Sequence, residues 1–180
     1  MIVPFRGTYR LSQEFGGNKA SYVKYGLEGH NGLDYALPNN TQIIAPHDGK
    51  VIEVADEGAV GYGKYIKIEN SKEGSVLAHL MSFQVKVGDT VSEGQPIALS
   101  DNTGNSTGPH LHWGYYLFPR NRQNGYAGFI NQLPLIQAPA PSPSPLPIPN
   151  PGYAPTHVGK QKKKDGIKYR SYEKDGKLLW

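Results

Sequence analysis

The sequence contains no cysteine among its 180 residues. Disulfide bonds, thiol nucleophiles, thiolate zinc sites and iron–sulfur clusters are therefore excluded, and a bound metal would need imidazole and carboxylate ligands. No run of eighteen apolar residues occurs, so no transmembrane span is expected. Pro4 and Arg6 interrupt the apolar start, which predicts that the chain begins without an export signal.

Charged residues are also few, at 19 % of the chain, whereas 22 glycines and 15 prolines disfavour long helices. Short runs of β-branched and aromatic residues, bounded by turn signals, occur at 51–55, 64–69 and 75–80. We expect a mainly β protein whose antiparallel sheet folds into a sandwich or partial barrel.

Nine of the fifteen prolines lie between Pro134 and Pro155 and predict an extended, polyproline-like spacer. We divide the chain into a β domain (1–137), a proline-rich linker (138–155) and a basic C-terminal tail (156–180). The tail carries eight Lys/Arg against three Asp/Glu, whereas residues 1–155 carry eleven against twelve. The β domain therefore has no electrostatic basis for binding nucleic acid.

The histidines carry most of the functional information. His110 and His112 lie in an aromatic-rich run that we interpret as a strand, where residues two apart point to the same face. The same proximity suits a metal ligand and a second imidazole that acts on bound water. By itself, the pair is equally consistent with chance in a Tyr/Trp-rich strand.

His30 and Asp34 form a second pair, in a glycine-containing segment that disfavours a helix. An even spacing on an extended segment aligns their side chains, and His112 would complete three ligands with an open fourth position, as in catalytic zinc sites. His79 ends the run from Val76 and has the opposite phase to its apolar residues, so we expect it to point away from them. His47, in an Asp-Gly turn, and His157, after the spacer, are interpreted as non-functional.

Several spaced phrases occur together, in order, between Gly7 and Leu117. They are His30-x-Gly32-x-Asp34, Ala45-Pro46-x-x-Gly49-x-Val51, Gly61-Tyr62-Gly63-Lys64, Ala78-His79-Leu80, Val87-Gly88-Asp89-x-Val91-x-x-Gly94-Gln95 and Thr103-Gly104-Asn105-Ser106-Thr107-Gly108-Pro109-His110-Leu111-His112. With these phrases the chain resembles the lysostaphin-type (LytM-type) zinc endopeptidases, which cut the peptide part of bacterial peptidoglycan.

The resemblance implies that His30, Asp34 and His112 bind Zn²⁺ and that His79 and His110 are catalytic. The sequence has no His-Glu-x-x-His segment, so imidazoles must replace the glutamate base of many zinc peptidases. One of His79 and His110 would accept a proton from water, and the other would stabilise the oxyanion with the metal. The sequence leaves open which does which.

Three glycine-containing segments, 16–29, 61–63 and 101–109, are expected to form the walls of the substrate groove, because loops at strand ends carry recognition. Tyr35, Tyr62 and Trp113 are left out of the predicted site, since aromatic residues in a β domain are more often core residues.

Parts of the sequence are also compatible with two other functions. Residues 87–97 also resemble biotinyl- and lipoyl-carrier barrels, but neither Met1 nor Met81 adjoins a modifiable lysine. A non-catalytic peptidoglycan-binding or structural phage module is the stronger alternative, and a full set of five site residues argues against it.

A wall-cleaving enzyme without an export signal needs another route to its substrate, which suggests a phage protein, either a virion-associated lysin or an endolysin released at lysis; an unusual secretion system is the alternative. Bacterial peptidoglycan is the expected partner. The basic tail, for which an Asp175-Gly176 turn predicts a small hairpin, would favour anionic wall polymers or other virion proteins. A solvated solubility tail is the alternative.

Overall fold

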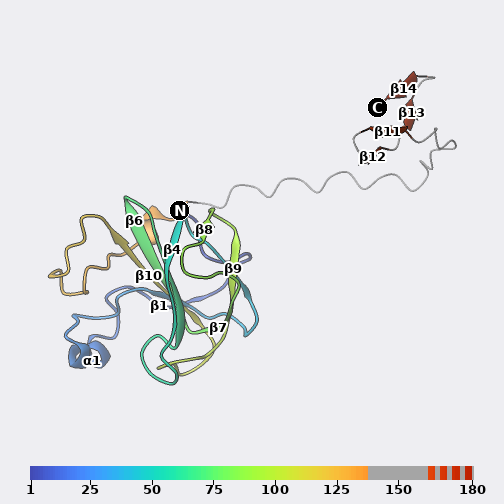
Figure 1. Ribbon diagram of the computed structural model, residues 1–180. Coiled ribbons are helices and arrows are strands. Elements are labelled where there is room, and N and C mark those ends of the chain that lie inside the picture. Colours follow the sequence, from blue (N-terminus) through green and yellow to red (C-terminus); the bar gives the residue numbers. More distant parts are fainter. Residues whose placement is uncertain (138–161, 165–166, 170–171, 175–176, 180) are drawn as a thin grey trace. The chain divides into compact units, whose positions relative to one another are not determined.

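The computed structural model describes residues 1–137 and four short strands between residues 162 and 179 (Figure 1). The chain divides into two units, Met1–Pro139 and Ala140–Trp180. The first unit is built mainly of antiparallel strands, which confirms the predicted fold class. No helix in the described part of the chain is long and apolar enough to cross a membrane.

Seven strands of the first unit form one sheet, in the order β1-β2-β10-β6-β5-β4-β8. Their bounds are β1 (Leu11–Gln13), β2 (Leu33–Tyr35), β4 (Gly49–Asp56), β5 (Lys64–Glu69), β6 (Glu73–Ala78), β8 (Thr90–Val91) and β10 (Leu111–Leu117). A smaller sheet has the order β3-β9-β7, with β3 (Gln42–Ile44), β9 (Pro96–Ser100) and β7 (Leu80–Phe83). The helical segments are short: α1 (Lys19–Tyr22), η1 (Val23–Tyr25) and η2 (Leu133–Leu135).

The main hydrophobic core fills the space between the two sheets. Leu77 and Trp113 from the larger sheet share one buried cluster with Ile43 and Ile97 from the smaller one. In Figure 1 the smaller sheet lies along one face of the larger sheet. Because successive strand residues point to opposite faces, Leu111, Trp113 and Tyr115 face this core while His112 faces the other way.

The opposite face of the larger sheet carries a second, smaller cluster. Its buried members are Tyr65, Val76, Ala78, Tyr116 and Phe129. Figure 1 shows α1 and the loop after β10 on this side. By strand alternation His112 lies on the same face of the larger sheet as Tyr116. His112 therefore points toward these loops and away from the main core.

The prediction of one continuous strand from Ser75 to Leu80 is wrong. β6 ends at Ala78, β7 begins at Leu80, and His79 between them has a left-handed φ of 61°. At this residue the chain leaves the larger sheet and enters the smaller one. Ala78 consequently belongs to the second cluster and Leu80 to the main core, so they do not share an apolar face.

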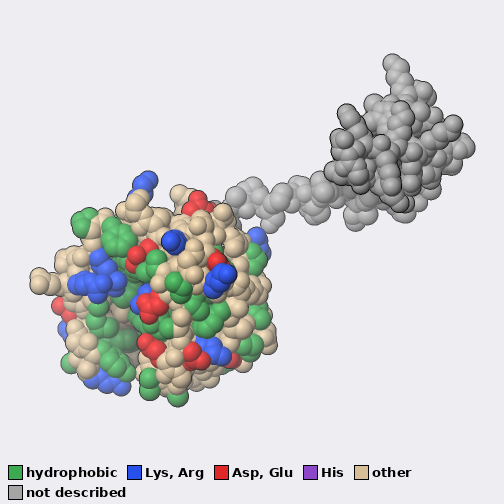
Figure 2. Space-filling view, viewed as in Figure 1, with side chains coloured by type: hydrophobic (Ala, Val, Ile, Leu, Met, Phe, Trp, Pro, Cys, Tyr) green, Lys and Arg blue, Asp and Glu red, His purple; other side chains and the backbone are tan. Residues whose placement is uncertain are grey.

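In the C-terminal unit, β11 (Lys162–Lys164) pairs with β12 (Ile167–Tyr169), and β13 (Tyr172–Lys174) pairs with β14 (Lys177–Leu179). β13 and β14 lie on either side of the predicted Asp175-Gly176 turn in the sequence. Residues 167–169 pair with β11 instead. The predicted linker, 138–155, lies outside the described residues. On the face of residues 1–137 shown in Figure 2, acidic and basic side chains are interspersed.

Candidate metal centre and active site

Three side chains, two from residues 30–34 and one from β10, meet on the face of the larger sheet that lies opposite the main core. Asp34 lies in β2 directly opposite His112 in β10, and His30 lies in the loop that leads into β2. His112 Nδ1 is 3.0 Å from Asp34 Oδ1, His30 Nε2 is 3.1 Å from the same oxygen, and the two nitrogens are 2.9 Å apart. The strand register therefore brings together the three predicted ligands.

The separation of these atoms fits a zinc site. Ligand bonds of 2.0–2.1 Å in a tetrahedral arrangement place neighbouring donor atoms about 3.3 Å apart, close to the distances found here. His30 Nδ1 donates to the Glu14 carbonyl at 3.1 Å, which leaves the Nε2 lone pair for a metal. All three side chains are buried and their donor atoms can hold one metal ion.

The protonation states also suit metal binding. Burial raises the pKa of Asp34, but the interactions of its carboxylate with His112 and His30 outweigh burial and hold that pKa well below its usual range. Burial lowers the pKa of His112. An ionised carboxylate and neutral imidazoles are the forms that coordinate a metal.

Gly32, in the middle of the His-x-Gly-x-Asp phrase, has a steric role. A Cβ at this position would lie 2.6 Å from His112 Cε1 and 2.8 Å from the Trp113 carbonyl oxygen. Both distances are shorter than side-chain carbons tolerate, and the Trp113 atom belongs to the backbone. The glycine therefore lets the His112 ring and the Trp113 carbonyl approach the backbone of residue 32 closely.

His79 and His110 are held beside the metal cluster in similar ways. His79 Nδ1 donates to the Thr103 carbonyl at 2.7 Å, and His110 Nδ1 donates to the Gly108 carbonyl at 2.8 Å. Their ring centroids are 4.5 Å apart. In both residues the backbone bond fixes the tautomer in which Nε2 carries the free lone pair, the form a proton acceptor needs.

The surroundings of these two imidazoles differ. Burial lowers the pKa of His79 to about 3, so its ring is neutral at neutral pH. His110 Nε2 lies 3.7 Å from Asp34 Oδ2 and precedes β10, which begins at Leu111. His110 and His112 both reach Asp34, but His110 is a loop residue rather than part of the predicted strand.

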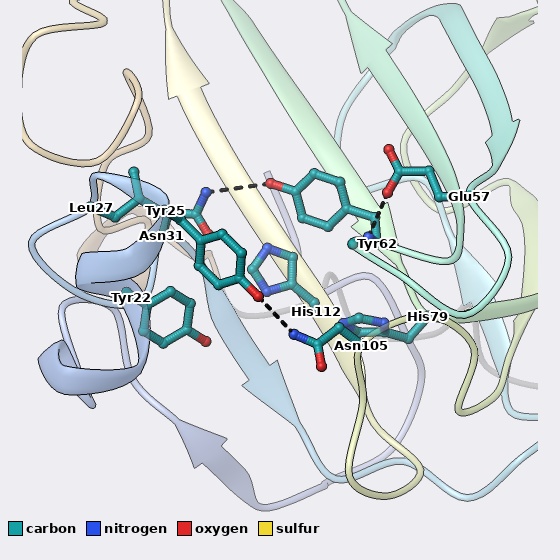
Figure 3. Close-up of a pocket in the computed structure, with 10 residues that line it drawn as sticks. Tyr22, Tyr25, Leu27, Asn31, Glu57, Tyr62, His79, Asn105 and His112 are labelled. Carbon is teal, nitrogen blue, oxygen red and sulfur yellow. Dashed lines mark hydrogen bonds between the residues drawn. The ribbon is translucent and has the colours of Figure 1, made fainter.

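A cavity of about 300 Å³ opens on one side of the cluster (Figure 3). It is lined by Tyr22, Tyr25, Leu27, Asn31, Glu57, Gly61, Tyr62, His79, Asn105 and His112. The three predicted wall segments each contribute to this list. Asn105 Nδ2 donates to the Tyr25 hydroxyl at 3.1 Å, and Asn31 Nδ2 donates to the Tyr62 hydroxyl at 3.3 Å, as the dashed lines in Figure 3 show.

A second cavity of about 290 Å³ adjoins the same cluster. Its lining residues are Arg10, Ser12, Gln13, Asp34, Ala36, Thr107, Gly108, Pro109 and His110. His79 and His112 line the first cavity, whereas Asp34 and His110 line the second. Residues of the metal cluster therefore contribute to both cavities.

Of the three aromatic residues left out of the predicted site, only Tyr62 lines a described cavity, while Tyr35 and Trp113 lie in the main core. The flanking glycines of Tyr62 were the available signal, because they mark an exposed turn. Sequence reasoning also missed Asn31, which lies inside the His-x-Gly-x-Asp phrase. His47 is buried rather than exposed in its turn, and its Nε2 lies 2.9 Å from Ser75 Oγ.

Comparison with known sequences identifies relatives of this arrangement. One relative is a Haemophilus influenzae protein with the name uncharacterized metalloprotease. It is 40 % identical over 115 residues, which cover 63 % of this chain and 24 % of that protein. The peptidoglycan DD-endopeptidase ShyA of Vibrio cholerae is 37 % identical over 119 residues, covering 66 % and 27 %. The chain thus spans about a quarter of the length of these curated relatives.

Solved structures share the fold. A zinc containing peptidase from Vibrio cholerae aligns with a TM-score of 0.61 and 30 % identity, covering 77 % of this chain and 40 % of that one. The catalytic domain of lysostaphin from Staphylococcus simulans aligns with a TM-score of 0.56 and 27 % identity, covering 71 % and 91 %. Together with the His/Asp/His donor set, these likenesses indicate Zn²⁺ as the cofactor. Residues 28–124 match the model of peptidase family M23, and the chain belongs to that metallopeptidase family.

Proposed function

We propose that this protein is a zinc-dependent endopeptidase that hydrolyses peptide bonds in bacterial peptidoglycan. The observation that carries the proposal is the convergence of three metal-ligand atoms with two imidazoles whose Nε2 atoms are free, between two cavities. A relative with the name peptidoglycan DD-endopeptidase supports the choice of substrate.

In this proposal His30 Nε2, Asp34 Oδ1 and His112 Nδ1 hold the zinc ion. Bound zinc polarises the scissile carbonyl and lowers the pKa of water. The protein would supply three ligands, which would leave one coordination position for water or substrate, as in catalytic zinc sites. Asp34 brings one negative charge, so the loaded site keeps a net positive charge.

His79 and His110 move the proton. One Nε2 accepts a proton from water as the water oxygen bonds to the carbonyl carbon. The other imidazole takes a proton from solvent at its Nε2 and donates a hydrogen bond from that atom to the developing oxyanion. When the C–N bond breaks, an imidazole returns the proton to the leaving nitrogen, which departs as an amine. The backbone carbonyls of Thr103 and Gly108 hold both rings in place throughout.

The two cavities suit an extended peptide that crosses the metal cluster, with the scissile bond between them. The bond is either within the stem peptide or within the cross-bridge. Tyr22 and Tyr62 offer phenol groups to the segment in the first cavity; burial raises the pKa of both, to about 12 for Tyr22, so these groups stay protonated.

Digestion of purified walls by the zinc-loaded protein tests the proposal, with the released ends identified by mass spectrometry. His79→Ala and His110→Ala are expected to keep one zinc per chain and to lose about 10²- to 10⁴-fold in rate, because neither ring is a ligand. Loss of zinc from either variant would reassign that residue. Wall binding without any new ends, in the wild type, would favour the non-catalytic module instead.

We also propose that residues 1–137 act without the linker (138–155) and the tail (156–180). The division into units at 139/140 supports this arrangement. A chain ending at Gln137 is expected to keep zinc and activity on soluble peptides and to bind whole walls less well, most visibly at low salt. Unchanged wall binding would leave the tail without this role. Action as a virion lysin or an endolysin stays a prediction.

A further inference from the structure

The two cavities beside the metal cluster differ in chemistry. The first is lined by three tyrosines and a leucine together with polar residues, and its one acidic residue, Glu57, accepts a hydrogen bond from the Tyr62 amide at 2.8 Å. The second is lined mainly by small and polar residues, and among those that the structure describes Arg10 is its one arginine or lysine. The two halves of a substrate therefore meet different surroundings.

The backbone fixes Arg10 close to the metal cluster. The Ala36 amide donates to the Arg10 carbonyl at 3.0 Å. Arg10 therefore lies opposite Ala36, which is two residues after Asp34 and directly follows β2. Two residues of a strand span about 7 Å. A group bound by Arg10 would therefore lie within about two residues of the scissile bond of an extended peptide.

The side chains of two neighbouring residues that line the same cavity form hydrogen bonds within residues 1–137, whereas the Arg10 side chain forms none there. Ser12 Oγ donates to the Asp34 carbonyl at 3.0 Å, and Gln13 Nε2 donates to the Tyr22 hydroxyl at 2.9 Å. The Arg10 side chain makes no hydrogen bond or ion pair within residues 1–137, and it is exposed. Asp34 is the other charged residue that lines the second cavity, and its carboxylate oxygens face His30, His110 and His112.

We propose that the second cavity is a carboxylate subsite in which Arg10 binds a free carboxylate of the substrate within two residues of the scissile bond. A guanidinium offers two parallel N–H donors that match a carboxylate, and it stays charged at every relevant pH. Arg10 is then a specificity-determining residue that favours peptides with an unmodified carboxylate in this position. The inference rests on the proposed peptidase function.

The test crosses two proteins with two substrates. Soluble cross-linked muropeptide dimers are used as isolated and after carbodiimide coupling to ammonia, which converts their carboxylates to carboxamides. The wild type is expected to cleave the native dimer at least tenfold more efficiently than the amidated one, mainly through KM. In Arg10→Gln this ratio should fall to within twofold, while the zinc content stays that of the wild type.

Arg6→Gln is the matched control, because Arg6 is also exposed but lines neither cavity, and it should keep the wild-type ratio. Arg10→Lys should recover part of it, since lysine keeps the charge without the paired donors. A wild-type ratio within twofold would overturn the inference, as would a tenfold ratio that survives in Arg10→Gln.

Calorimetry separates failure of this inference from failure of the proposed function. Monomeric muropeptides, native and amidated, are titrated into wild type and Arg10→Gln. A wild type that cleaves no dimer but binds native monomer tenfold more tightly than amidated monomer would overturn the peptidase activity and keep the subsite. Equal affinities, with normal cleavage, would overturn the subsite alone.

Discussion

Two groups of buried polar side chains, each built around histidine, lie on opposite faces of the larger sheet, and they differ in how their donors and acceptors are matched. In the first, His30, His112 and Asp34 turn three acceptor atoms toward one point, 2.9–3.1 Å from one another. In the second, His47 Nδ1 donates to the Asp48 carbonyl, Ser75 Oγ donates to His47 Nε2, and Trp113 Nε1 donates to Ser75 Oγ, at 2.9, 2.9 and 3.2 Å.

The comparison separates a metal site from a structural network. Converging lone pairs without enough protons between them repel one another unless a cation is present. Each donor of the His47 network meets an acceptor, so it needs no ligand and leaves the Ser75 hydroxyl committed to two partners. Although this serine and histidine have the separation of a catalytic pair, Ser75 is fully buried and is not accessible to a substrate.

The largest expected effect distinguishes the two groups by zinc content. His112→Ala removes one of three ligands, so purified protein should lose the one zinc per chain that the wild type holds. His47→Ala should retain it, because His47 lies in the matched network. Elemental analysis of both variants provides the measurement. Full zinc occupancy in His112→Ala would contradict the ligand assignment.

A smaller effect is expected from the packing behind the metal site. Gly32→Ala pushes a methyl group against His112 and the Trp113 carbonyl, so zinc affinity should fall about 10- to 100-fold as the ligand ring moves. Gly108→Ala is the matched control, since a Cβ there meets nothing within 4 Å. Competition with a chelator of known affinity measures both variants, and equal affinities would remove the steric role of Gly32.

The matched network should contribute to stability rather than to zinc binding. Ser75→Ala leaves His47 Nε2 and Trp113 Nε1 without their shared partner in a fully buried place. The expected loss is about 1–3 kcal/mol in the free energy of unfolding, with zinc content unchanged. Urea unfolding of the zinc-free proteins gives the value. A loss of zinc from Ser75→Ala would show that the two groups are coupled.

The smallest effect concerns a matched network at the surface. Hydrogen bonds from Lys67 and Tyr65 lower the pKa of Glu53. Since the folded pKa is the lower one, this contribution is present above the unfolded value of about 4.3 and is lost as the pH falls through the folded pKa. Exposure limits it to less than about 1 kcal/mol. Glu53→Gln should therefore match the wild type more closely at low pH than at pH 7; a constant difference would contradict this origin.

Much of the site was predictable from the sequence because its signals are local. Without cysteine, metal ligands had to be imidazole and carboxylate, and the spacing of His30 and Asp34 follows from a single turn into β2. Gly32 is required within the same five residues. Short β-branched runs between turn signals likewise predicted antiparallel strands, because alternation and turn chemistry act over a few residues.

Tertiary structure decided what depends on partners distant in the sequence. Strand register set His112 against Asp34, and the crossing between two sheets placed His79 in a left-handed conformation that its strand-like sequence did not predict. Burial of His47 against Ser75, and the position of Arg10 beside Asp34, depend on pairings between separate strands. Such long-range pairings follow from how whole sheets pack, so no local pattern in the chain specifies them.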